Sequence, residues 1–186
     1  MNICVYCSAS DKIAAGYFAL AVELGTEIAR RGDTLVYGGS SAGLMGELAK
    51  TVQANGAKVI GVIPQALVDL EVAYHNADEL FITANMRERK AGMEARSDAF
   101  VALPGGVGTL EEVFEIMAAR SLGIVRKPLV MLNHEQFYDP LIHLLEHMHQ
   151  ANFLRAGYES MVYFAPTVKV ALDYVDGYLA SSSADN

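Results

Sequence analysis

The stretch from Ala99 to Val113 reads AFVALPGGVGTLEEV. Its first five residues are apolar, and Pro104 closes the run, which indicates a buried strand. Three glycines follow within the next four positions, and the pattern then becomes helical over residues 109–121. A strand, a glycine-rich loop and a helix in this order predict one unit of a parallel α/β sheet.

The same alternation of short apolar runs and longer helical patterns fills the rest of the chain. The fold class that it predicts is α/β: a single Rossmann-like doubly wound domain over residues 1–180, with a mostly parallel sheet flanked by helices on both faces. Residues 181–186 are expected to form a frayed tail. We expect strands over residues 2–7, 34–37, 58–63, 79–83, 99–103 and 128–132, with a weaker one over 161–164. Helices are expected over residues 14–31, 44–54, 86–97, 109–121, 138–151 and 167–179.

Composition and charge limit the partners that this chain attracts. Of its 186 residues, 52% are hydrophobic, which is enough for a sizeable core. The net charge of −8 gives no general attraction for nucleic acid or an anionic membrane, so a bound phosphate has to be held locally. No apolar stretch approaches the roughly 20 residues of a membrane helix, and no signal peptide is evident.

The two cysteines indicate the compartment. Cys4 and Cys7 fit a C-x-x-C pattern, but they lie in an expected strand, whereas a redox pair opens a helix. Two cysteines cannot form a disulfide scaffold, so we expect a cytoplasmic protein.

The loop from Pro104 to Thr109 is the strongest candidate for a binding site. Its glycines let the backbone approach a ligand closely, and the helix that follows offers unpaired N–H groups at the positive end of its dipole. Such a loop holds a phosphate without any basic side chain, and the hydroxyl of Thr109 can add to it. The alternative is a tight turn in which Thr109 is an ordinary helix cap.

Glu112 has two interpretations. Residues 109–112 fit the S/T-x-x-E capping box, in which the glutamate accepts a hydrogen bond from the backbone N–H of Thr109, and local rules favour this role. A carboxylate in the first helical turn also faces whatever the loop holds, where it stabilises positive charge on a sugar or orients water. Glu115, one turn further on, is a weaker candidate.

A second glycine-rich segment, Gly38–Gly46, also follows a strand and opens a helix. It has neither the G-x-G-x-x-G spacing of a dinucleotide site nor the G-K-[ST] of a Walker loop. We interpret it as a wall of the same pocket, where small residues allow close approach.

A third segment, Met86-Arg87-Glu88-Arg89-Lys90, places three cations in one helical turn. Such a run is usually a solvated face. Arg89 is the exception that we argue for, because a planar guanidinium suits a phosphate or a base nitrogen and this helix could fold back over the mouth of the pocket.

The pattern His143-x-x-Glu146-His147 matches a metalloprotease motif. The expected helix buries a stripe that includes Leu144 and Leu145, which leaves the motif on its polar side. We therefore expect a solvated face there and no metal site.

Taken together, these segments resemble the LONELY GUY (LOG) family of cytokinin riboside 5′-monophosphate phosphoribohydrolases, often described as possible lysine decarboxylases. The likeness extends from Ile3 to Val175. The similar segments are Pro104–Glu112 to the family's PGGxGTxxE, Tyr37–Gly46 to YGGGxxGLMG, Arg89-Lys90 to the end of MHxRK, and Val62–Pro64 with Glu71 and His75 to VIP…E…H.

The resemblance implies that water cleaves the N-glycosidic bond of a nucleoside 5′-monophosphate, such as AMP or an N6-prenylated AMP. It implies Arg89 and Glu112 as the catalytic residues. It also implies a homodimer with the pocket near the interface, and no metal or organic cofactor. We assign substrate binding to Ser8, Gly39, Glu71, Lys90, Gly105, Gly106, Val107, Gly108, Thr109 and Glu111.

Three positions depart from the family motifs. Arg87 replaces the histidine of MHxRK, Ser40 replaces the third glycine after Tyr37, and Ser8 replaces a glycine after the first strand. They bear on base preference and pocket shape more than on the reaction. A non-catalytic nucleotide sensor on the same fold is the alternative function. A true lysine decarboxylase is disfavoured, because this short chain offers few lysines for a pyridoxal phosphate Schiff base.

Overall fold

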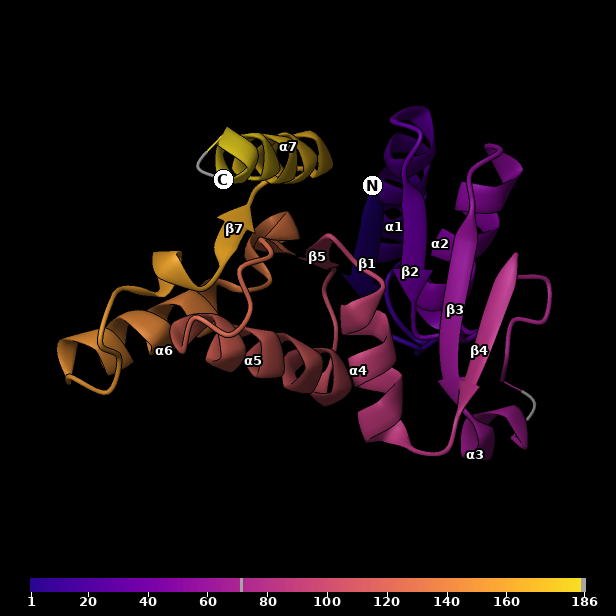
Figure 1. Cartoon of the computed structure of the whole chain (residues 1–186), viewed down its shortest axis with the longest axis horizontal. Helices are drawn as coiled ribbons and strands as arrows, with labels where there is room; N and C mark the ends of the chain where they lie inside the picture. The colour runs from indigo at the N-terminus through magenta and orange to yellow at the C-terminus, as the bar shows by residue number, and fades with distance from the viewer. Residues whose placement is uncertain (71, 185–186) are drawn as a thin grey trace.

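The structure, a computed structural model, describes residues 1–70 and 72–184. In these residues seven strands form one parallel sheet in the order β4-β3-β2-β1-β5-β6-β7 (Figure 1). The strands are β1 (Asn2–Tyr6), β2 (Thr34–Tyr37), β3 (Val59–Pro64), β4 (Glu79–Thr83), β5 (Ala99–Ala102), β6 (Leu129–Leu132) and β7 (Tyr163–Ala165). The expected parallel α/β sheet is confirmed.

Helices cover both faces of this sheet (Figure 1). The helices are α1 (Ala15–Arg30), α2 (Gly43–Ala54), α3 (Gln65–Val68), α4 (Met86–Ala95), α5 (Val107–Ser121), α6 (Asp139–Gln150) and α7 (Val168–Ala184), with short 3-10 turns η1 (His134–Gln136) and η2 (Tyr158–Ser160). Alternate residues of β1 separate the two cores: Ile3 and Val5 pack with α1, α2 and α7, while Cys4 and Tyr6 pack with α4, α5 and α6. This is the doubly wound arrangement that the sequence predicts.

The topology fixes the position of the site. The chain winds from β1 outward to β4 and then crosses back to β5 on the other side of β1. Ligands of such sheets bind where the winding reverses, outside the carboxyl ends of the strands. Here that point lies between the ends of β1 and β5, where Leu103 still donates to the carbonyl of Tyr6 at 3.0 Å.

The structure differs from the expectation at several element boundaries and in one short helix. Helix α5 begins at Val107, two residues early, because Gly106 caps it. Residues 181–184, expected in a frayed tail, form the last turn of α7. Strand β7 starts at Tyr163 rather than at Met161, and the single helical turn α3 was not expected.

No helix in the described part of the chain is long and apolar enough to cross a membrane. Cys4 and Cys7 are both buried free thiols, and Cys4 lies in a strand rather than at the start of a helix, which argues against a redox pair. Burial raises the pKa of the Cys4 thiol to about 12 and also raises that of Cys7, which makes both unreactive.

Candidate active site

The first turn of α5 is open toward the carboxyl ends of β1 and β5. Its cap residue, Gly106, has extended backbone geometry and no side chain that accepts a hydrogen bond from the helix. The leading N–H groups of a helix have no partner within the helix and carry the positive end of its dipole. The first turn of α5 therefore has the backbone geometry that the predicted anion site requires.

The second glycine-rich loop differs in this respect. The N–H of Gly43, at the start of α2, donates to the Asp11 carboxylate at 2.8 Å, so an anion of the protein itself already occupies that helix terminus. The N–H of Leu44 donates to the carbonyl of Ser8 at 3.0 Å. The segment Gly38–Gly46 is thus hydrogen-bonded to the loop after β1, which supports the interpretation of this segment as a wall of the pocket. Of the two helices that follow glycine-rich loops, α5 is then the one whose amino end is open.

Thr109 does not cap its helix. Because Gly106 is the cap, Thr109 stands at the third helical position and its residue is only 4% exposed. A Cβ atom on Gly105 would overlap the Thr109 Oγ1 atom, so the glycine lets the threonine pack directly beneath the loop. The capping-box interpretation of Glu112 is therefore wrong: three glycines allow the helix to start earlier than the Thr-x-x-Glu pattern suggests.

The carboxylate of Glu112 instead faces Arg89. Arg89 Nη1 donates to Glu112 Oε1 at 2.6 Å, and Arg89 Nε donates to the carbonyl of Val62 at 3.1 Å. Both residues are buried, at 5% and 8% exposure. Helices α4 and α5 thus bring together, from 23 positions apart, the two residues that were predicted to be catalytic.

The residues of the cation-rich turn differ in burial, as expected. Met86, Arg87 and Glu88 are exposed, while Arg89 is buried beneath them. The turn is oriented by a cap, since the Asn85 side chain accepts from the Glu88 N–H at 3.0 Å and the Glu88 carboxylate accepts from the Ala84 N–H. Asn85 and Glu88 are therefore the residues that orient Arg89, and the N-x-x-E spacing in the sequence could have shown this.

The guanidinium of Arg89 requires a glycine opposite it. A Cβ atom on Gly38 would overlap Arg89 Nη2, and one on Gly39, whose φ is +75°, would press on Ile63. The segment around Val72 crosses this loop, with the Tyr74 N–H donating to the Gly39 carbonyl at 2.8 Å. The small residues after β2 thus make room for an arginine of the protein.

Burial and the Arg89 charge act in opposite directions on Glu112. Removal from water raises the pKa of this carboxyl, the nearby guanidinium lowers it, and the net shift is upward. Upward shifts of this kind are typical of carboxyl groups that handle charge or protons during a reaction.

The remaining predicted residues lie at the rim of the site or outside the described residues. Lys90 pairs with Glu111 and, at 2.7 Å, with Glu115, which links α4 to α5 at the surface. Ser8 accepts a hydrogen bond from the Ser10 N–H at 3.1 Å within the loop after β1. Glu71 lies outside the described residues.

The metalloprotease-like motif lies away from this site. His143, Glu146 and His147 are exposed on α6, while Leu145 is buried. Leu144 was expected in the buried stripe, but it is 50% exposed. Within the described ranges, no three His, Cys, Asp or Glu residues lie close enough together to hold a metal ion.

Comparison with known proteins agrees with this geometry. The sequence model of the family described as "Possible lysine decarboxylase" matches residues 45–175. Among curated proteins, the cytokinin riboside 5′-monophosphate phosphoribohydrolase LOG of Oryza sativa subsp. japonica is 41% identical over 178 residues, covering 96% of this chain and 74% of that protein. A cytokinin riboside 5′-monophosphate phosphoribohydrolase of Arabidopsis thaliana is 40% identical, covering 96% of this chain and 84% of that protein.

Solved structures share the fold over nearly the whole chain. The Moco carrier protein from Chlamydomonas reinhardtii aligns with a TM-score of 0.71 at 28% identity, covering 97% of this chain and 98% of that one. The matched family model spans well over half of the sequence, and the curated relatives are about 40% identical. The chain therefore belongs to the LONELY GUY family, whose sequence model is described as possible lysine decarboxylase.

Proposed function

We propose that this protein hydrolyses the N-glycosidic bond of a nucleoside 5′-monophosphate, AMP or an N6-modified AMP, to a free base and ribose 5-phosphate. One observation carries the proposal: an open helix terminus lies on the same helix as Glu112, whose carboxylate forms a buried ion pair with Arg89. The relatives named phosphoribohydrolases support it.

The reaction needs a holder for the phosphate and a stabiliser for the sugar. The N–H groups of residues 106–109 hold the 5′-phosphate, which positions the ribose. The bond between C1′ and the base nitrogen breaks, and its electron pair leaves with the base. Glu112 stabilises the positive charge left on the ribose and orients the water that attacks C1′. One proton of that water ends on the base, and the hydroxyl stays on C1′.

Arg89 assists in one of two ways: it stabilises the departing base or it anchors the nucleotide. Its pairing with Glu112 keeps both groups ordered before substrate enters. The remaining substrate contacts that we propose are Ser8, Gly39, Glu71, Lys90, Gly105, Val107 and Glu111.

A nucleotide sensor or carrier on the same fold is the competing function, and the Moco carrier protein shows that the fold is compatible with carriage. A carrier has no need of a buried carboxylate beside an arginine, which favours catalysis. Lysine decarboxylation is disfavoured by the surroundings of Lys90, because its glutamate partners raise its pKa, whereas a Schiff-base lysine needs a lowered one.

The test is a screen of nucleoside 5′-monophosphates for release of free base, separated chromatographically, with unphosphorylated adenosine as the control. We expect adenine from AMP and much less from adenosine, because the helix terminus contributes only when a phosphate is present. Binding of the monophosphates without release of any base would favour the carrier instead.

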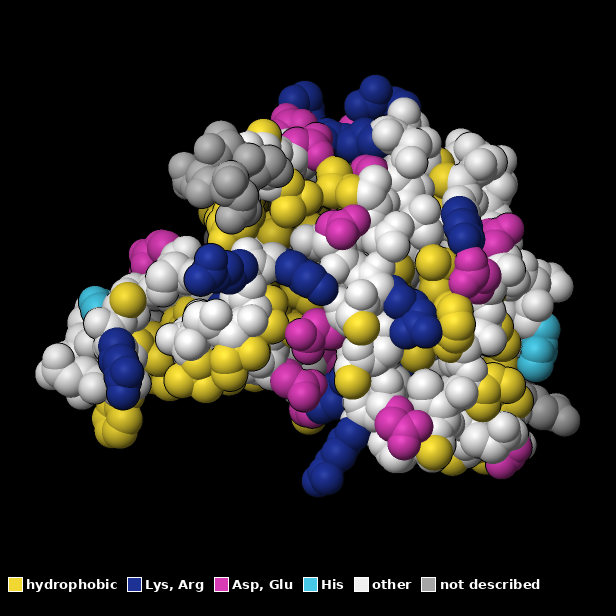
Figure 2. Space-filling view, viewed as in Figure 1, with side chains coloured by type: hydrophobic (Ala, Val, Ile, Leu, Met, Phe, Trp, Pro, Cys, Tyr) yellow, Lys and Arg dark blue, Asp and Glu magenta, His cyan; other side chains and the backbone are white. Residues whose placement is uncertain are grey.

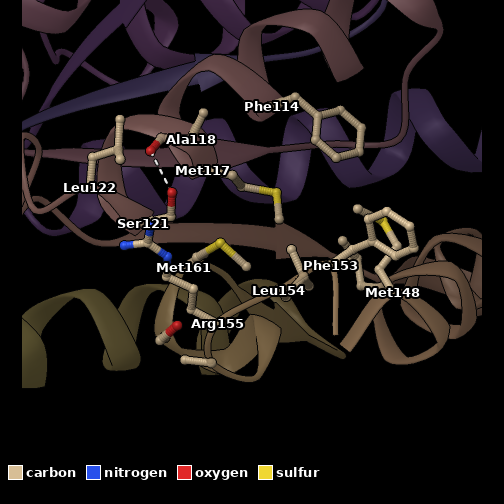
Figure 3. Close-up of a pocket in the computed structure, with 13 residues that line it drawn as sticks. Phe114, Met117, Ala118, Ser121, Leu122, Met148, Phe153, Leu154, Arg155 and Met161 are labelled. Atoms are coloured by element: carbon tan, nitrogen blue, oxygen red, sulfur yellow. Dashed lines mark hydrogen bonds between the residues drawn. The ribbon is translucent and has the colours of Figure 1, made fainter. Parts of the chain in front are cut away.

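We also propose a homodimer that uses the face formed by α5, α6 and η2. Hydrophobic side chains gather over this region (Figure 2), where Phe114, Leu122, Leu144 and Phe153 are 38–79% exposed. Phe114, Leu122 and Phe153 line a cavity of about 380 Å³, in which Phe114 and Met117 of α5 lie across from Leu154 (Figure 3). An exposed apolar patch of this kind is typical of a protein interface, and helix α5 connects it directly to the phosphate loop.

We further propose a cytoplasmic location. Both cysteines are free thiols, the state that a reducing compartment maintains.

A further inference from the structure

Tyr138 contacts the residue that precedes the phosphate loop, Leu103, although the two are 35 positions apart in sequence. Its residue is 2% exposed, and its hydroxyl donates to the carbonyl of Leu103 at 2.7 Å. Leu103 is the last residue before Pro104, and its own N–H is bonded to Tyr6. Both backbone polar atoms of Leu103, the residue just before the loop, are therefore hydrogen-bonded: its N–H to β1 and its carbonyl to Tyr138.

The protein holds this tyrosine by a turn of unusual backbone geometry. Glu135 and Gln136, just before it, have φ values of +50° and +62°, which residues other than glycine rarely adopt. The Asn133 side chain accepts from the Tyr138 N–H at 2.7 Å and donates to Asp139 at 2.8 Å. An unfavourable turn with its own side-chain hydrogen bonds is typical of segments whose position matters for function.

We propose that Tyr138 is a positioning residue for the phosphate loop. This inference rests on the proposed function, in which the N–H groups of residues 106–109 hold the 5′-phosphate. Those N–H groups belong to the backbone, so their direction depends on where the loop begins. The backbone of Gly105 lowers the pKa of this phenol, although burial outweighs the effect and raises the pKa overall. The hydroxyl is thus close to the chain on both sides of Pro104.

The test is Tyr138→Phe, which keeps the packed ring and removes the hydroxyl. The control is Ser97→Ala at the amino end of β5, which also removes a buried hydroxyl bonded to a carbonyl at 2.7 Å. Dissociation constants for ribose 5-phosphate and for adenine are measured by calorimetry for the parent and both variants, together with the melting temperature. We expect Tyr138→Phe to weaken ribose 5-phosphate binding about fivefold, as the loss of one buried hydrogen bond implies, and to leave adenine binding unchanged.

Ser97→Ala is expected to lower the melting temperature without changing either constant. Equal ribose 5-phosphate affinity in parent and Tyr138→Phe would overturn the proposal, and so would an equal weakening of both ligands. The binding readout is separate from turnover. Absence of base release from AMP would reject the proposed function, whereas the calorimetry still decides the role of Tyr138. A parent protein that binds no ribose 5-phosphate would reject the loop as a phosphate site and Tyr138 with it.

Discussion

The guanidinium of Arg89 and the carboxylate of Glu112 form an ion pair with 2.6 Å between Nη1 and Oε1, and both residues are more than nine-tenths buried. Removal of one partner from such a pair costs about 3–5 kcal/mol, because the other charge stays buried alone. A pair that merely stabilised the fold could be replaced by apolar side chains at no loss. Its location at the carboxyl ends of the strands instead favours a chemical role.

Glu112→Gln tests that role with little structural change. The amide oxygen still accepts from Arg89, but the negative charge that stabilises the ribose is lost. We expect kcat/KM for AMP to fall about 100-fold or more, as for removal of one stabilising group from other active sites. Glu23→Gln, on the exposed side of α1, is the control and keeps the parent rate. Base release by Glu112→Gln at the parent rate would show that the carboxylate is not catalytic.

The raised pKa of Glu112 predicts how stability depends on pH. Its usual value is near 4.5, and burial raises it in the folded protein. Below pH 4.5 the folded and unfolded states both hold the proton. Between 4.5 and the raised pKa only the folded state does, so the free energy of unfolding falls as pH rises through this window. Denaturant titrations of the parent and Glu112→Gln should therefore differ in this pH range, with the parent losing stability relative to the variant.

Activity follows the opposite trend in the same window. The ionised carboxylate is the form that stabilises a cationic ribose, so kcat/KM should rise as Glu112 loses its proton. A profile of kcat/KM against pH checks this. An acidic limb at or below pH 4.5 would contradict a raised pKa in the free enzyme.

Gly38→Ala tests whether the loop after β2 keeps room for Arg89. The new Cβ would overlap Arg89 Nη2 and lie 3.0 Å from the Met45 sulfur, so the guanidinium has to move away from Glu112. Displacements of this size lower rates about 100-fold in other enzymes, and we expect a similar fall in kcat/KM. Gly177→Ala on α7 is the matched control, because nothing lies within 4 Å of its new methyl group. It should stabilise the helix by roughly 0.5–1 kcal/mol and leave the rate unchanged.

The sequence predicts the sheet well because local signals mark its parts. Apolar runs such as 99–103 end at glycine or proline, and each strand was found within about two residues. The start of a helix is harder to predict from the sequence where glycines precede it. Glycine has no side chain to mark a cap, so the beginning of α5 was expected at Thr109 and the structure places it at Val107.

The site is harder to predict because its contacts join distant segments. In the sequence, it is mainly the resemblance to the family's MHxRK motif that distinguishes Arg89 from its charged neighbours. Nothing in the sequence shows that its guanidinium lies against Gly38. Tyr138 has no local signature, since an aromatic residue at a helix start is ordinary core material. Its role depends on a contact with Leu103 that only the folded chain makes.

Leu144→Glu tests the proposed homodimer. Helical spacing predicts that Leu144 is buried, yet it is 50% exposed on α6, next to Leu145, which lines the cavity. A second copy that covers this face would bury it, and a stable interface needs about 800 Å² on each partner. By light scattering after gel filtration, we expect the parent at twice 20.1 kDa and Leu144→Glu at 20.1 kDa, because a buried unpaired carboxylate disfavours association. Ile82→Glu, at a 53% exposed position on β4, is the control and should leave the mass of the parent unchanged. A parent protein that elutes as a monomer, or a Leu144→Glu variant that stays dimeric, would place the interface elsewhere or remove it.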